Sequence, residues 1–234
     1  LAGEVGKILN EELGEDFDRF LNYLRTILLK DKARLSLLQE FEQKIYVAKV
    51  RSKAGEDKKP ALLAKGAQTF EFVERYLKHY NLLLGGDNKG YAGTDFKFDN
   101  LIHVMLTGLP STDWLPPLLR YFDKFKYQSL YDFLKKLDNK FSSDWIAQHP
   151  PTERIERMNL VTRAIEVATS PDMLFADPCF NIDKAPFMRN IEVEVYGRRF
   201  TRYLLIKLDF IFHNPDQRMN LESLSVEHIL PQNP

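Results

Sequence analysis

The sequence predicts a mainly α-helical protein, a multi-helix array with room for one or two short strands near its C-terminus. Three observations predict this class. Apolar residues recur at spacings of three and four along most of the 234 residues, which is typical of amphipathic helices. Only residues 190–197 (NIEVEVYG) alternate for long enough to suggest a strand outside the last dozen residues. The chain shows no internal repeat, and no stripe lasts long enough for a coiled coil.

The first part of the chain is predicted to contain three helices. Apolar stripes predict helices over residues 15–30, 35–48 and 61–84. Residues 51–60 (RSKAGEDKKP) interrupt the pattern with charge, a glycine and a proline, so we expect a loop there. Residues 85–95 (GGDNKGYAGTD) end the third helix. This glycine-rich run lacks the spacing of a phosphate-binding loop, which argues against that kind of nucleotide site.

The middle of the chain is predicted to be helical as well. Four further stripes predict helices over residues 98–110, 113–125, 130–141 and 155–168. Residues 170–181 (SPDMLFADPCFN) then form a connection, because they combine prolines, aspartates and an asparagine without a helical period.

The C-terminal part differs from the rest. Residues 190–197 are predicted to form a strand, and residues 198–212 (RRFTRYLLIKLDFIF) a helix that is apolar on nearly all sides and therefore buried. We accordingly divide the chain into a helical region, residues 1–185, and a second region, residues 186–234.

Composition excludes several classes of protein. Thirty-three basic and thirty-three acidic residues balance, so the chain lacks the overall positive charge of most nucleic-acid-binding domains, and any DNA contact must be local. A single cysteine, Cys179, excludes an internal disulfide. No stretch approaches the roughly 20 apolar residues of a membrane span, which predicts a soluble, cytoplasmic protein with no membrane partner. A zinc site is not expected, because four histidines are scattered without ligand spacing: His79, His103, His149 and His213.

The last residues of the chain, SLSVEHILPQNP (223–234), combine residue types that suit a metal-dependent reaction. Apolar and polar residues alternate here, which predicts extended backbone over residues 224–230. Glu227 would supply oxygen ligands to a hard divalent cation such as magnesium. His228 titrates near neutral pH and would take a proton from an attacking water. The alternative is a solvent-facing pair at the end of a strand.

This ending resembles the GmrSD-like modification-dependent (type IV) restriction endonucleases. In that family a nucleotide-hydrolysing domain of ParB-like fold is followed by helices and then by an HNH nuclease domain. YGRRFTRYLLIKLD (196–209), a polar spacer and SLSVEHILPQNP are similar in order and spacing to the beginning of that nuclease domain. EDFDRFLNYLRTILLK (15–30) and LSLLQEFEQKIY (35–46) are similar to the helices that follow the nucleotidase domain.

The resemblance implies that Glu227 is a metal ligand and His228 the general base of the first HNH segment. The asparagine and second histidine of the HNH pattern would follow Pro234. The D-G-Q-Q-R motif of the nucleotidase part does not occur, and the chain does not begin with methionine. We therefore expect a fragment of a metal-dependent DNA endonuclease of an anti-phage defence system, inactive by itself. Residues 1–185 would follow an absent nucleotidase domain, and residues 186–234 would begin a truncated nuclease domain.

The resemblance also implies ligands and partners. The intact nuclease would bind DNA and a divalent metal such as magnesium, and a nucleotide would bind only the absent upstream domain, so no cofactor is expected on this chain alone. Contacts with the missing nucleotidase and nuclease segments are expected, and a homo-oligomer is left open. The helices would transmit the state of the nucleotidase to the nuclease. The alternative function is a non-catalytic helical interaction or regulatory module.

One local basic cluster could contact DNA phosphates. Its members are Arg189, Arg198, Arg199 and Arg202, of which the last three are the candidate DNA contacts. On a helix Arg198 and Arg202 would share a face. The alternative is a solvated surface on which these arginines pair with neighbouring acidic residues, namely Glu192, Glu194 and Asp209.

Overall fold

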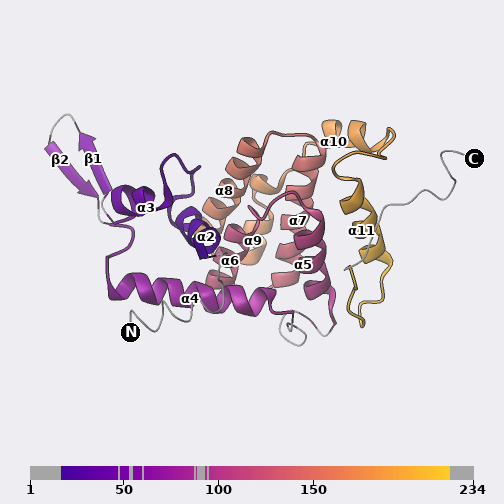
Figure 1. Ribbon diagram of the computed structural model, residues 1–234, viewed down its shortest axis with the longest axis horizontal. Helices are drawn as coiled ribbons and strands as arrows, with labels where there is room; N and C mark the ends of the chain where they lie inside the picture. The colour runs from indigo at the N-terminus through magenta and orange to yellow at the C-terminus, as the bar shows by residue number, and fades with distance from the viewer. Residues whose placement is uncertain are drawn as a thin grey trace, which may run out of the picture.

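The computed structural model describes residues 17–46, 48–52, 55–59, 61–86, 88, 93 and 95–221, with the backbone alone over 48–52 and 55–59. It confirms the mainly α-helical class (Figure 1). The elements are α2 (Phe17–Leu29), α3 (Leu37–Glu40), a π-helical turn η2 (Phe41–Ile45), β1 (Ala48–Ser52), β2 (Gly55–Lys59), α4 (Ala67–Leu84), α5 (Lys97–Gly108), α6 (Leu115–Phe125), α7 (Leu130–Ile146), α8 (Pro151–Val167), α9 (Pro171–Phe175), a 3₁₀ turn η3 (Pro178–Phe180), α10 (Lys184–Ile191) and α11 (Thr201–Phe212).

The main hydrophobic core lies between α2, α4, α5, α6, α7 and α8. Its largest members include Trp114, Tyr121 and Phe133, all fully buried. Tyr121 stacks on Phe133 with ring centroids 3.9 Å apart and an interplanar angle of 9°. Buried aromatic pairs of this kind contribute both apolar area and specific geometry. The apolar stripes of the sequence thus converge on one core.

A second, smaller core holds α11 against α5 and α7 (Figure 1). Val104 of α5, Trp145 of α7 and Tyr203 of α11 are buried together there. The approach of the helices is close: a Cβ atom placed on Gly108 would lie 3.0 Å from the Tyr203 ring. Glycine at the end of α5 therefore lets the backbone of α11 come near.

Polar contacts also join α11 and the following residues to the central helices. The Tyr203 hydroxyl donates to Asp138 of α7 at 2.8 Å, and the Lys207 ammonium lies 2.6 Å from the other carboxylate oxygen. The side chain of Asn100 in α5 donates to the Gln217 carbonyl at 2.9 Å and accepts from the Met219 amide at 3.0 Å. The segment after α11 thereby runs back along α5.

The predicted strand over residues 190–197 is wrong. Residues Lys184–Ile191 form α10, and the chain then turns through Gly197, whose φ is +75°. Two apolar side chains of α10, Phe187 and Ile191, are one helical turn apart and both pack against the second core. In the described parts of the chain no strand lies beside this segment, so an extended conformation would leave its backbone groups unpaired.

Two other expectations change in detail. Residues 51–60, predicted as a loop, contribute to an antiparallel hairpin in which β1 pairs with β2, Ala48 opposite Lys59. The helix predicted over residues 198–212 exists as α11, but it is buried on one side only. Its outer side carries exposed apolar residues, because α5 and α7 cover just one face: Leu205, Leu208, Ile211 and Phe212. The strand predicted over residues 224–230 lies outside the described residues.

None of the described helices combines the length and the apolar character that crossing a membrane requires.

Candidate anion-binding pocket

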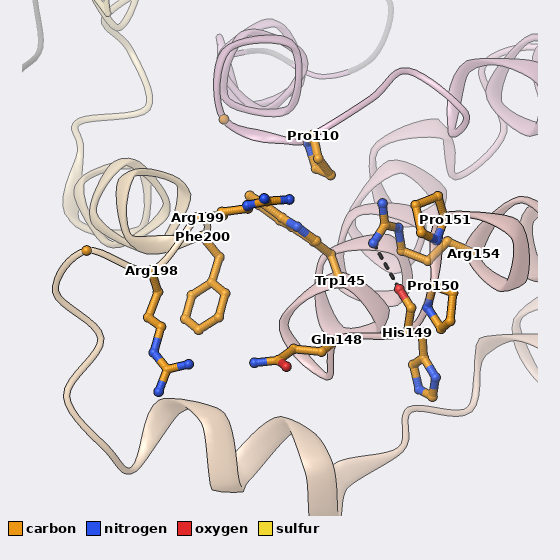
Figure 2. A pocket seen from close by; sticks show the side chains of 12 residues that line it. Pro110, Trp145, Gln148, His149, Pro150, Pro151, Arg154, Arg198, Arg199 and Phe200 are labelled. Carbon is orange, nitrogen blue, oxygen red and sulfur yellow. Dashed lines mark hydrogen bonds between the residues drawn. The ribbon is translucent and has the colours of Figure 1, made fainter.

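A pocket of about 710 Å³ opens where three elements meet (Figure 2). The end of α5 contributes Gly108 and Pro110. The segment before α11 contributes residues 197–200, and the turn from α7 to α8 contributes six residues: Trp145, Gln148, His149, Pro150, Pro151 and Arg154. Its volume lies within the range of small-molecule sites, which is roughly 300–1,000 Å³.

The turn between α7 and α8 gives the pocket its shape. Helix α7 ends at Ile146, and Gln148 adopts a left-handed conformation with φ of +64°, which reverses the chain. Two prolines follow, and the second, Pro151, is the first residue of α8. Proline suits this position because its fixed φ is helical and its missing N–H would have no partner there. The first turn of α8 therefore faces the pocket.

The charged side chains that line the pocket are all arginines. They come from two elements, with Arg154 on α8 and both Arg198 and Arg199 before α11. In Figure 2 Arg199 reaches in above Trp145 and Arg154 points in from the opposite side. No aspartate or glutamate lies among the described residues that line this pocket. The resulting positive potential favours an anion.

Arg154 is the most unusual of the three arginines. It is only 9% exposed, and its Nη1 donates to the His149 carbonyl at 3.0 Å. Its Nε is buried without a hydrogen-bond partner. No described carboxylate lies within 4.0 Å of it, and burial lowers the pKa of its guanidinium, an effect that the more distant Asp113 and Asp144 oppose. A buried cation without a counter-ion is costly, so a site of this kind calls for an anionic ligand.

A neighbouring arginine on the same helix has the opposite surroundings. Arg157 lies 2.8 Å from an oxygen of Asp144 and 2.6 Å from an oxygen of Glu153. Burial lowers the pKa of Arg157, but these two carboxylates outweigh it and the net shift is upward. The same Glu153 oxygen also lies 3.2 Å from the Nδ1 of His149. Asp144 of α7 and Glu153 of α8 therefore pair with Arg157, and neither forms an ion pair with Arg154 within 4.0 Å.

Of the basic cluster predicted from the sequence, the structure brings two members into the pocket. Arg198 and Arg199 line it, whereas Arg202 is exposed on α11 outside it. Helix α11 begins at Thr201, so Arg198 precedes the helix and does not share a helical face with Arg202. The alternative interpretation paired these arginines with Glu192, Glu194 and Asp209. No such ion pair forms within 4.0 Å in the described part of the chain.

Sequence reasoning missed Arg154. Its importance depends on its burial and on the missing carboxylate, and both are tertiary features. The one signal in the sequence was the proline pair of QHPPTER, which marks a helix start and places Arg154 in the first turn.

The predicted metal and catalytic residues, Glu227 and His228, lie outside the described residues. Within the ranges that are described, no group of three or more histidine, cysteine, aspartate or glutamate side chains is arranged to hold a metal ion. Cys179 is partly buried, and burial raises the pKa of its thiol, so it is not a reactive nucleophile.

Comparisons of the chain with protein-family models, with curated proteins and with solved structures find no match.

Proposed function

We propose that this chain is the helical region and first HNH segment of a DNA endonuclease similar to the GmrSD-like restriction enzymes, and that the arginine-lined pocket contacts DNA phosphates. One observation carries the proposal. Arg198 and Arg199, directly before the helix that leads to the EHILPQNP motif, face a pocket lined by described residues that include no carboxylate. Arginines without protein counter-ions are the usual partners of phosphate.

The way α11 is held supports a positioning role. The four residues before α11 line the pocket, and the helix itself is fixed to α7 through Asp138 and to α5 through the packing of Tyr203 on Gly108. A phosphate bound at the start of α11 would thus be held in a constant relation to the central helices. Phosphate contacts of this kind set the register of a protein on DNA without reading its sequence.

The chemical step is assigned to residues outside the described part of the chain. Glu227 would hold a divalent metal such as magnesium, which would stabilise charge on the phosphate, and His228 would accept the proton of a water. The proposal places the protein in the cytoplasm with DNA as its substrate, in an anti-phage defence system. No metal ion is assigned to the pocket, because the charges of its described lining favour an anion rather than a cation.

A second function has an observation of its own. The outer face of α11 exposes four apolar side chains at helical spacing, and Phe212 is 84% exposed. Such a face is typical of a surface that binds another protein segment. A helical interaction or regulatory module without chemistry would use this face and would have no need for the arginines of the pocket.

DNA binding as a function of salt separates these two functions. We expect the chain to bind a short labelled duplex with an affinity that falls with increasing salt. The double variant Arg198→Met/Arg199→Met should reduce the slope of log K against log salt by about 2, because each lost phosphate contact removes about 0.9.

The matched control removes two positive charges elsewhere. Lys65 and Lys78 are exposed, each paired with a glutamate, and lie away from the pocket. Lys65→Met/Lys78→Met changes the net charge equally and should leave the slope unchanged. An equal loss of slope in both double variants would reject the pocket as a DNA contact. No binding of the duplex by the parent chain would favour the interaction module.

A further inference from the structure

Arg154 stands apart from the other deeply buried cations of the described chain. Three basic side chains there are at least nine-tenths buried: Arg25, Lys140 and Arg154. Arg25 lies 3.0 Å from Glu40, and Lys140 lies 3.1 Å from Asp144. Arg154 alone among them has no carboxylate within 4.0 Å. Because buried charges are normally paired or engaged with a ligand, this arginine indicates a built anion site and not merely a basic surface.

The helix that carries Arg154 strengthens the same site. The pocket is lined by Pro150, Pro151 and Arg154, so it lies at the N-terminal end of a helix of 17 residues. The N-terminal end of a helix carries partial positive charge. Pro150 and Pro151 have no N–H, so the hydrogen-bond donors of this site are the arginine side chains. Arg199 adds a second guanidinium on the side of the pocket opposite Arg154 (Figure 2). Phosphate, with several oxygens, suits such a convergence of donors better than a single carboxylate.

The rest of the lining is mixed, with Gln148 and His149 as its polar side chains and an apolar part beside them. Pro110, Pro150 and Pro151 line it together with Trp145, whose ring is held edge-on by Phe200 and Tyr203 at centroid distances of 6.3 and 6.1 Å. The volume of about 710 Å³ is far larger than one phosphate needs. An apolar wall beside an anion site matches a ligand with a planar apolar group attached to a phosphate. Nucleobases stack on flat side chains irrespective of base identity.

We infer that this pocket binds a single 5′-nucleotide, with its phosphate on Arg154 and Arg199 and its base against the proline and tryptophan wall. The inference deepens the proposed function, because it rests on the same pocket as a contact for DNA. The nucleotide has two possible sources, a free monophosphate or one unpaired nucleotide of a DNA strand. Phosphate and base are common to both.

Calorimetric titration of the chain with deoxyadenosine monophosphate tests the inference. We expect saturable binding with one nucleotide per chain. Arg154→Met should lose at least about tenfold in affinity, since it removes a charge-assisted hydrogen bond to the phosphate. Deoxyadenosine and inorganic phosphate should each bind more weakly than the monophosphate. Equal binding of inorganic phosphate and the monophosphate would reject the base site, and unchanged affinity in Arg154→Met would reject the phosphate site.

Arg157 provides a matched control on the same helix. Arg157→Met should keep the nucleotide affinity but lower the melting temperature, because buried Asp144 loses a partner. Arg154→Met should lose affinity while the melting temperature stays constant or rises, because it removes a buried charge that has no carboxylate partner. A fall in melting temperature for Arg154→Met with retained nucleotide binding would show a purely structural arginine and overturn the inference.

Competition experiments distinguish the sources and separate this inference from the proposed function. A short single strand that displaces the monophosphate, where a duplex does not, identifies an unpaired nucleotide of DNA. Displacement by free monophosphates alone supports the nucleotide site and counts against a role in DNA binding. Duplex binding that depends on Arg198 and Arg199, without any binding of the monophosphate, leaves the proposed function standing and rejects the nucleotide site.

Discussion

Glu40 is a buried carboxylate and Asp123 a partly buried one, and the ionisation of both is coupled to folding. Burial raises the pKa of Glu40, but the Arg34 amide, Lys44 and Arg25 outweigh it and lower that pKa to about 2. Burial likewise raises the pKa of Asp123, and its hydrogen bond with His79 and neighbouring cations lower it to about 2. Both groups therefore favour the folded state when they are ionised.

We predict that the free energy of unfolding falls between about pH 4.5 and pH 2. A carboxyl whose pKa is lowered in the folded state contributes its full stabilisation above the unfolded pKa and loses it as the pH falls towards the folded value. For Glu40 this contribution is about 3 kcal/mol. Urea denaturation across this range measures it. Glu40→Gln should lower the free energy of unfolding at neutral pH and make its decrease below pH 4.5 smaller. An unchanged decrease in this variant would contradict the assignment.

Single residues also show what a sequence can and cannot reveal. Arg198 and Arg199 were predicted as binding residues because clustering is visible in the sequence, and the structure places both in the pocket. Arg202 was predicted with them, yet the start of α11 at Thr201 separates it from the pocket. Arg154 was missed because its burial and its lack of a carboxylate depend on α5, on the turn before α8, and on the carboxylates that Arg157 engages.

At the scale of elements, α11 depends on a buried charged contact. Asp138 on α7 is fully buried, and its carboxylate contacts Lys207 at 2.6 Å and Tyr203 at 2.8 Å. Burial raises the pKa of Asp138, and both partners act against that rise. Removing the cation would leave a buried carboxylate supported by one hydroxyl.

We predict that Lys207→Met destabilises the chain by about 3 kcal/mol, as expected when one partner of a buried ion pair is removed. Chemical denaturation measures this change. Arg202→Met on the same helix is the control, and it should change stability by less than about 0.5 kcal/mol because Arg202 is exposed and forms no ion pair with a described residue. The double variant Asp138→Asn/Lys207→Met keeps an acceptor for Tyr203 and should recover much of the loss. Equal stabilities of Lys207→Met and Arg202→Met would contradict this account of α11.

Elements also differ in how well they can be predicted. The helices with clear apolar stripes, such as α2 and α7, were predicted within a few residues at their N-terminal ends, because a stripe that faces a core is visible in the sequence. The strand over residues 190–197 failed because alternation alone does not supply a neighbouring strand, and α10 could bury Phe187 and Ile191 instead. The exposure of one face of α11 depends on how many helices surround it, and the local sequence pattern does not indicate that number.

At the scale of the whole molecule, the charges balance overall but are unevenly placed. The described lining of the pocket has three arginines and no carboxylate, although the chain has equal numbers of acidic and basic residues. The balanced net charge predicted that any DNA contact must be local. The three arginines of the pocket form a local positive surface of the kind that such a contact would need. The two cores meet at α5 and α7, so the pocket is formed by the same helices that hold the molecule together.

The central claim is that the chain belongs to a metal-dependent DNA endonuclease with His228 as its general base. Cleavage of modified DNA by the full-length protein in the presence of magnesium tests it most directly. His228→Ala should reduce the cleavage rate by at least about 100-fold, the usual scale for loss of a general base. His213→Ala, which removes a histidine of α11's C-terminal end, should retain activity. Cleavage by His228→Ala at the rate of the parent protein would contradict the claim.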